Sequence, residues 1–149
     1  MIRPDLEAIP PYVPGVRDER AIKLSSNECA EGPLPPVLDA MRKALGEINR
    51  YPDIGALQLR AALGEHLRVA PEQVALGAGS SALCQQLVSI AAQPGDEVIF
   101  PWRSFEAYPI FVQVVGATPV RVPLGSDDRL DMPALAAAVT DRTKLIFIC

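Results

Sequence analysis

The chain has 149 residues, of which 49% are hydrophobic and 21% charged, as expected for an ordinary globular domain. Its formal net charge of −4 comes without a cluster of Lys or Arg, which argues against a nucleic-acid partner. No apolar run approaches the roughly 18 residues that span a bilayer, and residues 1–5 lack the apolar stretch of a signal peptide. These features predict a cytoplasmic protein with no membrane partner.

The cysteines carry no sign of a metal site or a disulfide framework. There are three of them, Cys29, Cys84 and Cys149, an odd number without CxxC or metal-ligand spacing. Free thiols in a reducing compartment are therefore expected, and no metal ligands are predicted.

Residues 1–27 are predicted to form an N-terminal arm rather than part of the core. Pro4, Pro10, Pro11 and Pro14 preclude a regular helix there and favour an extended path. Residues 28–149 then form the domain proper.

Beyond the arm, hydrophobic periodicity and turn signals predict alternating helices and strands. Helices are expected at about 35–45, 56–69, 80–92, 104–115 and 132–139, and strands at 73–77, 97–100, 118–124 and 144–149. Such alternation is typical of βαβ units, so the predicted fold class is α/β with a mostly parallel sheet.

The segment Gly77-Ala78-Gly79-Ser80-Ser81-Ala82 lies between a predicted strand and a predicted helix. Small residues let the backbone approach an anion, and the helix N-terminus offers free N–H groups that two hydroxyls supplement. This pattern predicts a phosphate-binding site. An equally simple interpretation is that Ser80 caps the helix and the glycines make a tight turn. The segment is neither a Walker loop nor a dinucleotide fingerprint.

Aromatic residues follow the predicted strand that ends at Phe100. At the carboxyl end of a parallel strand, Phe105 is placed to offer a flat face to a heteroaromatic ring. The alternative is that Trp102, Phe105 and Tyr108 only pack the next helix against the sheet.

Taken together, the whole chain resembles the start of the class I/II aminotransferases, specifically the histidinol-phosphate and aromatic branch. Six short motifs carry the resemblance, in order: Leu24-Ser25-Ser26-Asn27-Glu28, Arg50-Tyr51-Pro52, Pro71-Glu72-Gln73-Val74, Gly77-Ala78-Gly79-Ser80-Ser81, Pro94-Gly95-Asp96 and Phe105-Glu106-Ala107-Tyr108.

The resemblance implies a fold-type I homodimer that binds pyridoxal 5'-phosphate, with this chain as the N-terminal half of the large domain. Gly79, Ser80 and Ser81 would hold the cofactor phosphate, and Phe105 would lie on the pyridine ring. Tyr51 would reach the phosphate of the partner subunit's cofactor.

The resemblance also implies that Tyr12 borders the substrate pocket and that Asn27 lies near the substrate carboxylate. Two positions depart from the family's pattern. Cys29-Ala30 replaces the Asn-Pro that follows Asn-Glu in relatives, and Ala82 stands where an acidic residue is frequent nearby.

Transamination needs a lysine that forms a Schiff base, together with an acid on the pyridine nitrogen. The lysines of this chain are Lys23, Lys43 and Lys144, and none lies in the family's lysine motif. The lysine, the cofactor acid and the carboxylate-binding arginine are expected beyond Cys149. The chain alone is therefore predicted to be inactive, with no catalytic residue of its own.

The resulting hypothesis is an aminotransferase of amino-acid biosynthesis, in the histidine or aromatic pathways. It would transfer an amino group between an amino acid or histidinol phosphate and a 2-oxo acid such as 2-oxoglutarate. One alternative on the same fold is a threonine-phosphate decarboxylase-like lyase. Another is a non-catalytic α/β module that binds a phosphorylated ligand or a protein partner.

Overall fold

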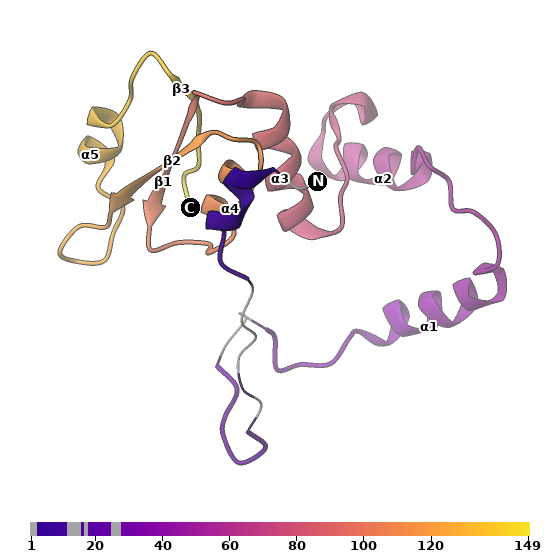
Figure 1. Ribbon diagram of the computed structural model, residues 1–149. Helices are drawn as coiled ribbons and strands as arrows, with labels where there is room; N and C mark the ends of the chain where they lie inside the picture. The colour runs from indigo at the N-terminus through magenta and orange to yellow at the C-terminus, as the bar shows by residue number, and fades with distance from the viewer. Residues whose placement is uncertain (1–2, 12–15, 17, 25–27) are drawn as a thin grey trace. The chain divides into compact units, whose positions relative to one another are not determined.

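The computed structural model describes residues 3–11, 16, 18–24 and 28–149. The chain divides into two compact units, which are described separately (Figure 1). One unit comprises Met1–Pro10 and Ala75–Cys149, and the other comprises Pro11–Val74. The first ten residues of the predicted arm therefore group with the C-terminal part of the chain.

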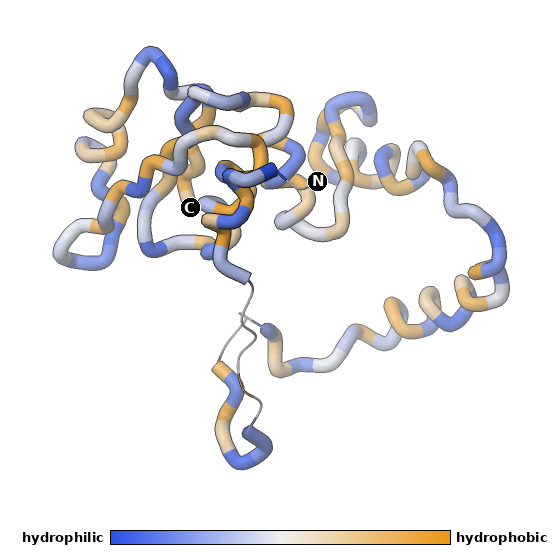
Figure 2. The backbone as a smooth tube through the Cα atoms, viewed as in Figure 1, coloured by the Kyte–Doolittle hydropathy of each residue, from blue (hydrophilic) through white to orange (hydrophobic). Residues whose placement is uncertain are grey.

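The unit of residues 11–74 is helical in its described part. Helix α1 spans Pro35–Ala44 and continues into a short 3-10 turn, and helix α2 spans Leu57–Leu67. Both predicted helices are confirmed, as is the break around Arg50–Asp53. Pro35 opens α1 because its missing N–H belongs to the first turn, where no intrahelical acceptor exists. Apolar and polar residues alternate along α1 (Figure 2), and the apolar stripe of this helix, which includes Val37 and Met41, is exposed.

The second unit contains a three-stranded parallel sheet. Strands β1 (Glu97–Trp102), β2 (Thr118–Pro123) and β3 (Thr143–Ile146) are arranged in the order β2-β1-β3. The predicted mostly parallel α/β sheet is therefore confirmed.

Three helices cover the two faces of this sheet. Helices α3 (Gly79–Ala91) and α4 (Tyr108–Val114) pack on one face, and α5 (Met132–Ala137) packs on the other (Figure 1). Because side chains alternate along a strand, Val98 and Phe100 face α3 and α4 while Ile99 faces α5.

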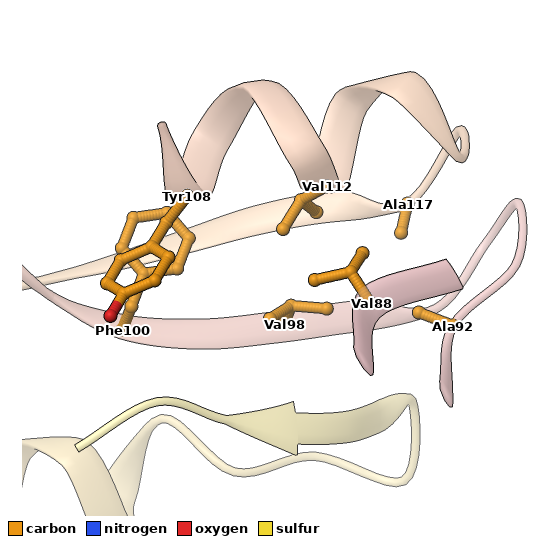
Figure 3. Packing of buried hydrophobic residues seen from close by; sticks show 7 residues of the cluster. All are labelled: Val88, Ala92, Val98, Phe100, Tyr108, Val112 and Ala117. Atoms are coloured by element: carbon orange, nitrogen blue, oxygen red, sulfur yellow. The ribbon is translucent and has the colours of Figure 1, made fainter. Parts of the chain in front are cut away.

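The larger core cluster lies between the sheet and helices α3 and α4 (Figure 3). Val88, Val98, Phe100 and Val112 are completely buried there, and Tyr108 is 6% exposed. Burying each large apolar side chain contributes about 1.5–3 kcal/mol, so this cluster is what holds α3 and α4 on the sheet.

At the amino end of β1, the carboxylate of Glu97 links two segments of the sheet. Glu97 is 5% exposed. It accepts hydrogen bonds from Thr140 Oγ1 at 2.6 Å and from Arg142 Nε at 2.9 Å. Both hydrogen bonds hold the pKa of Glu97 below its ordinary value, and the one from Thr140 has the larger effect. These contacts join the start of β1 to the segment that leads into β3.

Four predicted elements differ from the structure. The predicted strand 144–149 is shorter, because β3 ends at Ile146. Residues 73–77 form no strand: a 3-10 turn, Pro71–Gln73, is followed by irregular backbone, since no described strand lies beside it to supply ladder hydrogen bonds. Helix α4 begins at Tyr108 rather than at 104, with Pro109 in its first turn. In the predicted extended arm, Pro4–Ala8 form a 3-10 helix, which Pro4 opens.

Candidate cofactor site

The predicted phosphate-binding segment forms the N-terminus of helix α3. The helix begins at Gly79, and the residue in the N-cap position is Ala78, which has no side-chain acceptor. Ser80 and Ser81 are exposed in the first turn. The interpretation of Ser80 as the helix cap is therefore wrong. The first-turn N–H groups have no side-chain cap and carry the positive end of the helix dipole, which together favour an anion.

The two glycines of this segment serve different purposes. A Cβ at Gly77 would lie 3.1 Å from Ala82 Cβ and 3.3 Å from Leu83 Cδ2, so the loop passes close over the helix it precedes. Gly79 has a φ of +74°, and a Cβ there would meet no atom within 4 Å. Gly79 is thus required by its backbone conformation, and the space beside it is open.

The N-terminus of α3 and the loop that follows β1 lie at the same edge of the sheet. Helix α3 has 13 residues, about 20 Å, and a tight turn then leads into β1, whose six residues also span about 20 Å. Since the helix runs back along the sheet, it starts where the strand ends. Cys84, in the second turn of α3, lies against Tyr108 at the start of α4, so the first half of α3 contacts the end of the loop that carries Phe105.

The aromatic residues after β1 divide into buried and accessible ones. Tyr108 belongs to the core, and Trp102 is partly buried against it, so the packing interpretation holds for both. Phe105 lies in the loop before α4 and remains 40% exposed. Its ring stands perpendicular to that of Tyr108, with centroids 5.4 Å apart, and lies 6.3 Å from the ring of Phe111. Phe105 is therefore anchored by neighbours while much of its surface stays accessible.

Phe105 lines an open pocket of about 670 Å³ at the carboxyl ends of the strands. Leu124 and Leu130, from the loop after β2, contribute apolar surface. Arg103 and Arg129 contribute positive charge, which exceeds the single negative charge of Asp128. Both guanidiniums are well exposed and only loosely paired, Arg103 with Glu106 at 3.9 Å and Arg129 with Asp127 at 3.6 Å. The pocket can thus take a molecule with an apolar body and an acidic group.

A group of hydroxyls and thiols that no sequence motif indicated lies beside this pocket. Burial raises the pKa of Tyr108, and the nearby thiols of Cys149 and Cys84 raise it further. The neighbouring hydroxyls of Ser104 and Tyr108 lower the pKa of Cys149. Ser104 Oγ is buried without a hydrogen bond of good geometry, so its contact with the thiol is one of proximity. The only sequence signal for this group was the position of Tyr108 three residues after Phe105.

The remaining predicted site residues belong to the unit of residues 11–74. Tyr51 belongs to the unit of residues 11–74, where its ring is fully exposed. Tyr12 and Asn27 lie outside the described residues. Their roles stay predictions.

None of the three lysines is among the residues that line the pocket. Lys23 pairs with Glu28 at 2.6 Å, and Lys43 lies exposed on α1. Lys144 lies in β3, and its Nζ donates to the backbone oxygen of Asp141 at 3.2 Å. Within the described ranges, no group of three or more His, Cys, Asp or Glu residues is arranged to hold a metal ion. The described helices are also too short or too polar to cross a membrane.

Several relatives resemble the chain over its whole length. It is 64% identical over 149 residues to an aromatic amino acid aminotransferase of Corynebacterium diphtheriae, covering 100% of this chain and 43% of that protein. It is 53% identical over 148 residues to one of Mycolicibacterium vanbaalenii, covering 99% of this chain and 42% of the relative. The chain thus spans less than half the length of these relatives.

Solved structures show the same fold. A histidinol-phosphate aminotransferase of Sinorhizobium meliloti, in complex with pyridoxal-5'-phosphate, matches 78% of this chain and 32% of its own, at 33% identity and a TM-score of 0.73. An aromatic aminotransferase of Pyrococcus horikoshii matches 88% of this chain and 38% of its own, at 29% identity and a TM-score of 0.69. The model of the aminotransferase class I and II family matches residues 19–149. The chain therefore belongs to the class I and II aminotransferases.

Proposed function

We propose that this chain supplies the phosphate-binding and ring-stacking part of a pyridoxal-phosphate site, and that the whole protein is an aromatic amino acid aminotransferase. The observation that carries the proposal is the uncapped N-terminus of α3 at the same sheet edge as the accessible ring of Phe105. Family membership and the names of the relatives support it.

The residues present fit the cofactor. The first-turn N–H groups of α3 and the hydroxyls of Ser80 and Ser81 are suited to a phosphate dianion, since charge-assisted hydrogen bonds are about twice as strong as neutral ones. The open space beside Gly79 leaves room for the phosphate oxygens. Phe105 offers a ring face that excludes water from one side of the pyridine. When bound, the cofactor supplies an electron sink for amino-group chemistry.

The substrate is proposed to be an aromatic amino acid, with a 2-oxo acid such as 2-oxoglutarate as amino acceptor. The names of the relatives favour this choice over histidinol phosphate. Histidinol phosphate is the second candidate, because a solved structure of that name is similar and two arginines line the pocket beside Phe105. The cytoplasmic setting stays a prediction from composition.

A homodimer is also proposed. The exposed ring of Tyr51 and the exposed apolar residues of α1 support it, since both offer apolar surface that a partner subunit can bury. Tyr51 would then serve the partner subunit's cofactor. Sedimentation of the natural-length protein as a monomer at micromolar concentration would contradict this assignment.

The test of function uses the natural gene product. Its intact mass is measured before and after borohydride reduction, and we expect a pyridoxyl adduct on a lysine. Steady-state assays then compare phenylalanine and tyrosine with histidinol phosphate, and kcat/KM is expected to favour the aromatic substrates by at least about tenfold. Absence of an adduct refutes the cofactor proposal, and carbon dioxide release without amino transfer from threonine phosphate would indicate the lyase instead.

A further inference from the structure

Tyr108 is a core residue that also contacts the loop of the candidate site. Its ring stacks on Phe147 at 4.3 Å and 12°, lies 5.7 Å from Phe100 at 47°, and meets Phe105 at 5.4 Å and 90°. Figure 3 shows the rings of Tyr108 and Phe100 side by side at one end of the buried cluster. Tyr108 therefore joins the end of β1, the segment after β3 and the loop that carries Phe105.

Apart from Tyr108, few contacts restrict the orientation of the Phe105 ring. It lies outside any helix or strand, and its ring contacts only Tyr108 and Phe111 among the described aromatic rings. A phenylalanine on a loop is otherwise free to change its side-chain rotamer. The perpendicular contact with Tyr108, which is itself held parallel to Phe147, sets the plane of the Phe105 ring and hence the direction of its exposed face.

The hydroxyl of Tyr108 extends this connection to helix α3. It lies close to the thiol of Cys84, in the second turn of α3, and to the thiol of Cys149. Because burial holds the pKa of Tyr108 above its ordinary value, the hydroxyl stays neutral at physiological pH. The ring therefore lies between Cys84 of the helix that begins at Gly79 and the ring of Phe105.

We propose that Tyr108 is a positioning residue for cofactor binding: it holds the Phe105 ring in the plane needed to stack on the pyridine ring. This inference rests on the proposed function, because it assumes that Phe105 contacts the cofactor. Tyr108 itself does not touch the cofactor, and its effect on binding passes through Phe105.

The experiment is a double-mutant cycle on the natural-length protein, with Phe105→Leu, Tyr108→Leu and the double variant. The apoenzymes are titrated with pyridoxal phosphate, and both the dissociation constant and the visible circular dichroism of the bound cofactor are recorded. We expect each single substitution to weaken binding by about three- to tenfold and to reduce the dichroism. In the Phe105→Leu background, Tyr108→Leu should weaken binding by less than about twofold further, because the two residues act through one contact.

Two variants separate this role from general packing. Tyr108→Phe keeps all ring contacts and should bind the cofactor within about twofold of the wild type. Val112→Ala opens a cavity in the same core cluster, without a ring contact to Phe105, and should lower the melting temperature while leaving the dissociation constant unchanged. If Tyr108→Leu does not fold, Phe147→Leu removes the stacking partner instead and should show the same dependence on Phe105.

The outcomes are distinguishable. Equal weakening by Tyr108→Leu in both backgrounds would mean that Tyr108 acts as ordinary core, and the proposal would be wrong. Unchanged binding and dichroism in Tyr108→Leu would also overturn it. If Phe105→Leu alone leaves binding unchanged, the inference fails while cofactor binding stands. If the wild-type protein binds no cofactor, the proposed function itself fails.

Discussion

Replacing Gly79 by Ala tests whether the N-terminus of α3 is the phosphate site. Gly79 has a φ of +74°, and a residue with a Cβ is destabilised by roughly 1–2 kcal/mol in this left-handed region. Ala also lowers the conformational entropy of the unfolded chain, which stabilises the folded state by about 0.4–1 kcal/mol. A Cβ at Gly79 meets nothing within 4 Å, so no steric clash adds to this difference. The free energy of unfolding should therefore fall by about 1 kcal/mol.

Gly95→Ala is the matched control. Gly95 has a φ of +97°, and a Cβ there also meets nothing within 4 Å, so its backbone penalty is similar. It lies in the turn that enters β1, at the opposite edge of the sheet from the start of α3. The two variants should therefore lose similar stability, while only the methyl group at Gly79 enters the space proposed for the phosphate.

The assay combines urea denaturation with fluorescence titration of the natural-length apoenzyme by pyridoxal phosphate. We expect Gly79→Ala to weaken binding by about tenfold or more, equivalent to 1.4 kcal/mol, and Gly95→Ala by less than about twofold. Equal weakening by both variants would show that lost stability, not the lost site, is responsible. Normal binding by a destabilised Gly79→Ala would refute the assignment of the phosphate site to this helix.

Three further predictions concern single side chains. Ser80→Ala and Ser81→Ala should each weaken cofactor binding by about three- to tenfold without lowering the melting temperature. The control is Ser89→Ala, which removes only a hydrogen bond to the Gln85 carbonyl within α3 and should leave the cofactor titration unchanged. Glu97→Gln should flatten the acid limb of a stability–pH profile: the depressed pKa of Glu97 stabilises the fold above the unfolded value of about 4.3, and that contribution disappears as pH falls through the folded pKa. An unchanged acid limb would contradict this assignment. Asp131→Ala removes the side-chain acceptor for the Ala134 N–H at the start of α5 and should lower the free energy of unfolding by about 1 kcal/mol in urea, while Asp131→Asn keeps most of it.

Helices and strands that are bounded by Gly or Pro residues were predictable from the sequence. The turn at Pro94–Asp96 depends on Gly95, whose positive φ few other residues adopt. This turn signal predicted where α3 ends and where β1 begins. The start of α4 was misplaced although a signal was present. Pro109 fits the first turn of a helix, where its missing N–H has no acceptor to bond, and it marks a start near Tyr108 rather than at 104.

Features that depend on distant partners were not predictable in the same way. The expected strand at 73–77 has suitable residues, but a strand forms only where a neighbour supplies ladder hydrogen bonds. The role of Tyr108 depends on its stacking with Phe147, which lies beyond two further strands in the chain. Likewise, the apolar stripe of α1 predicted a helix correctly but carried no information on what covers it.

The shared position of the two main parts of the candidate site could be predicted because they are close in the sequence. Gly79 and Phe105 are joined by one helix, one tight turn and one strand, whose similar lengths bring the two ends to the same edge of the sheet. Residues assigned by resemblance alone, such as Tyr51, belong to a separate unit, and no short connection fixes their place. The local βα arrangement therefore places the N-terminus of α3 and Phe105 at one edge of the sheet, and Tyr108 lies against both Cys84 of α3 and the ring of Phe105.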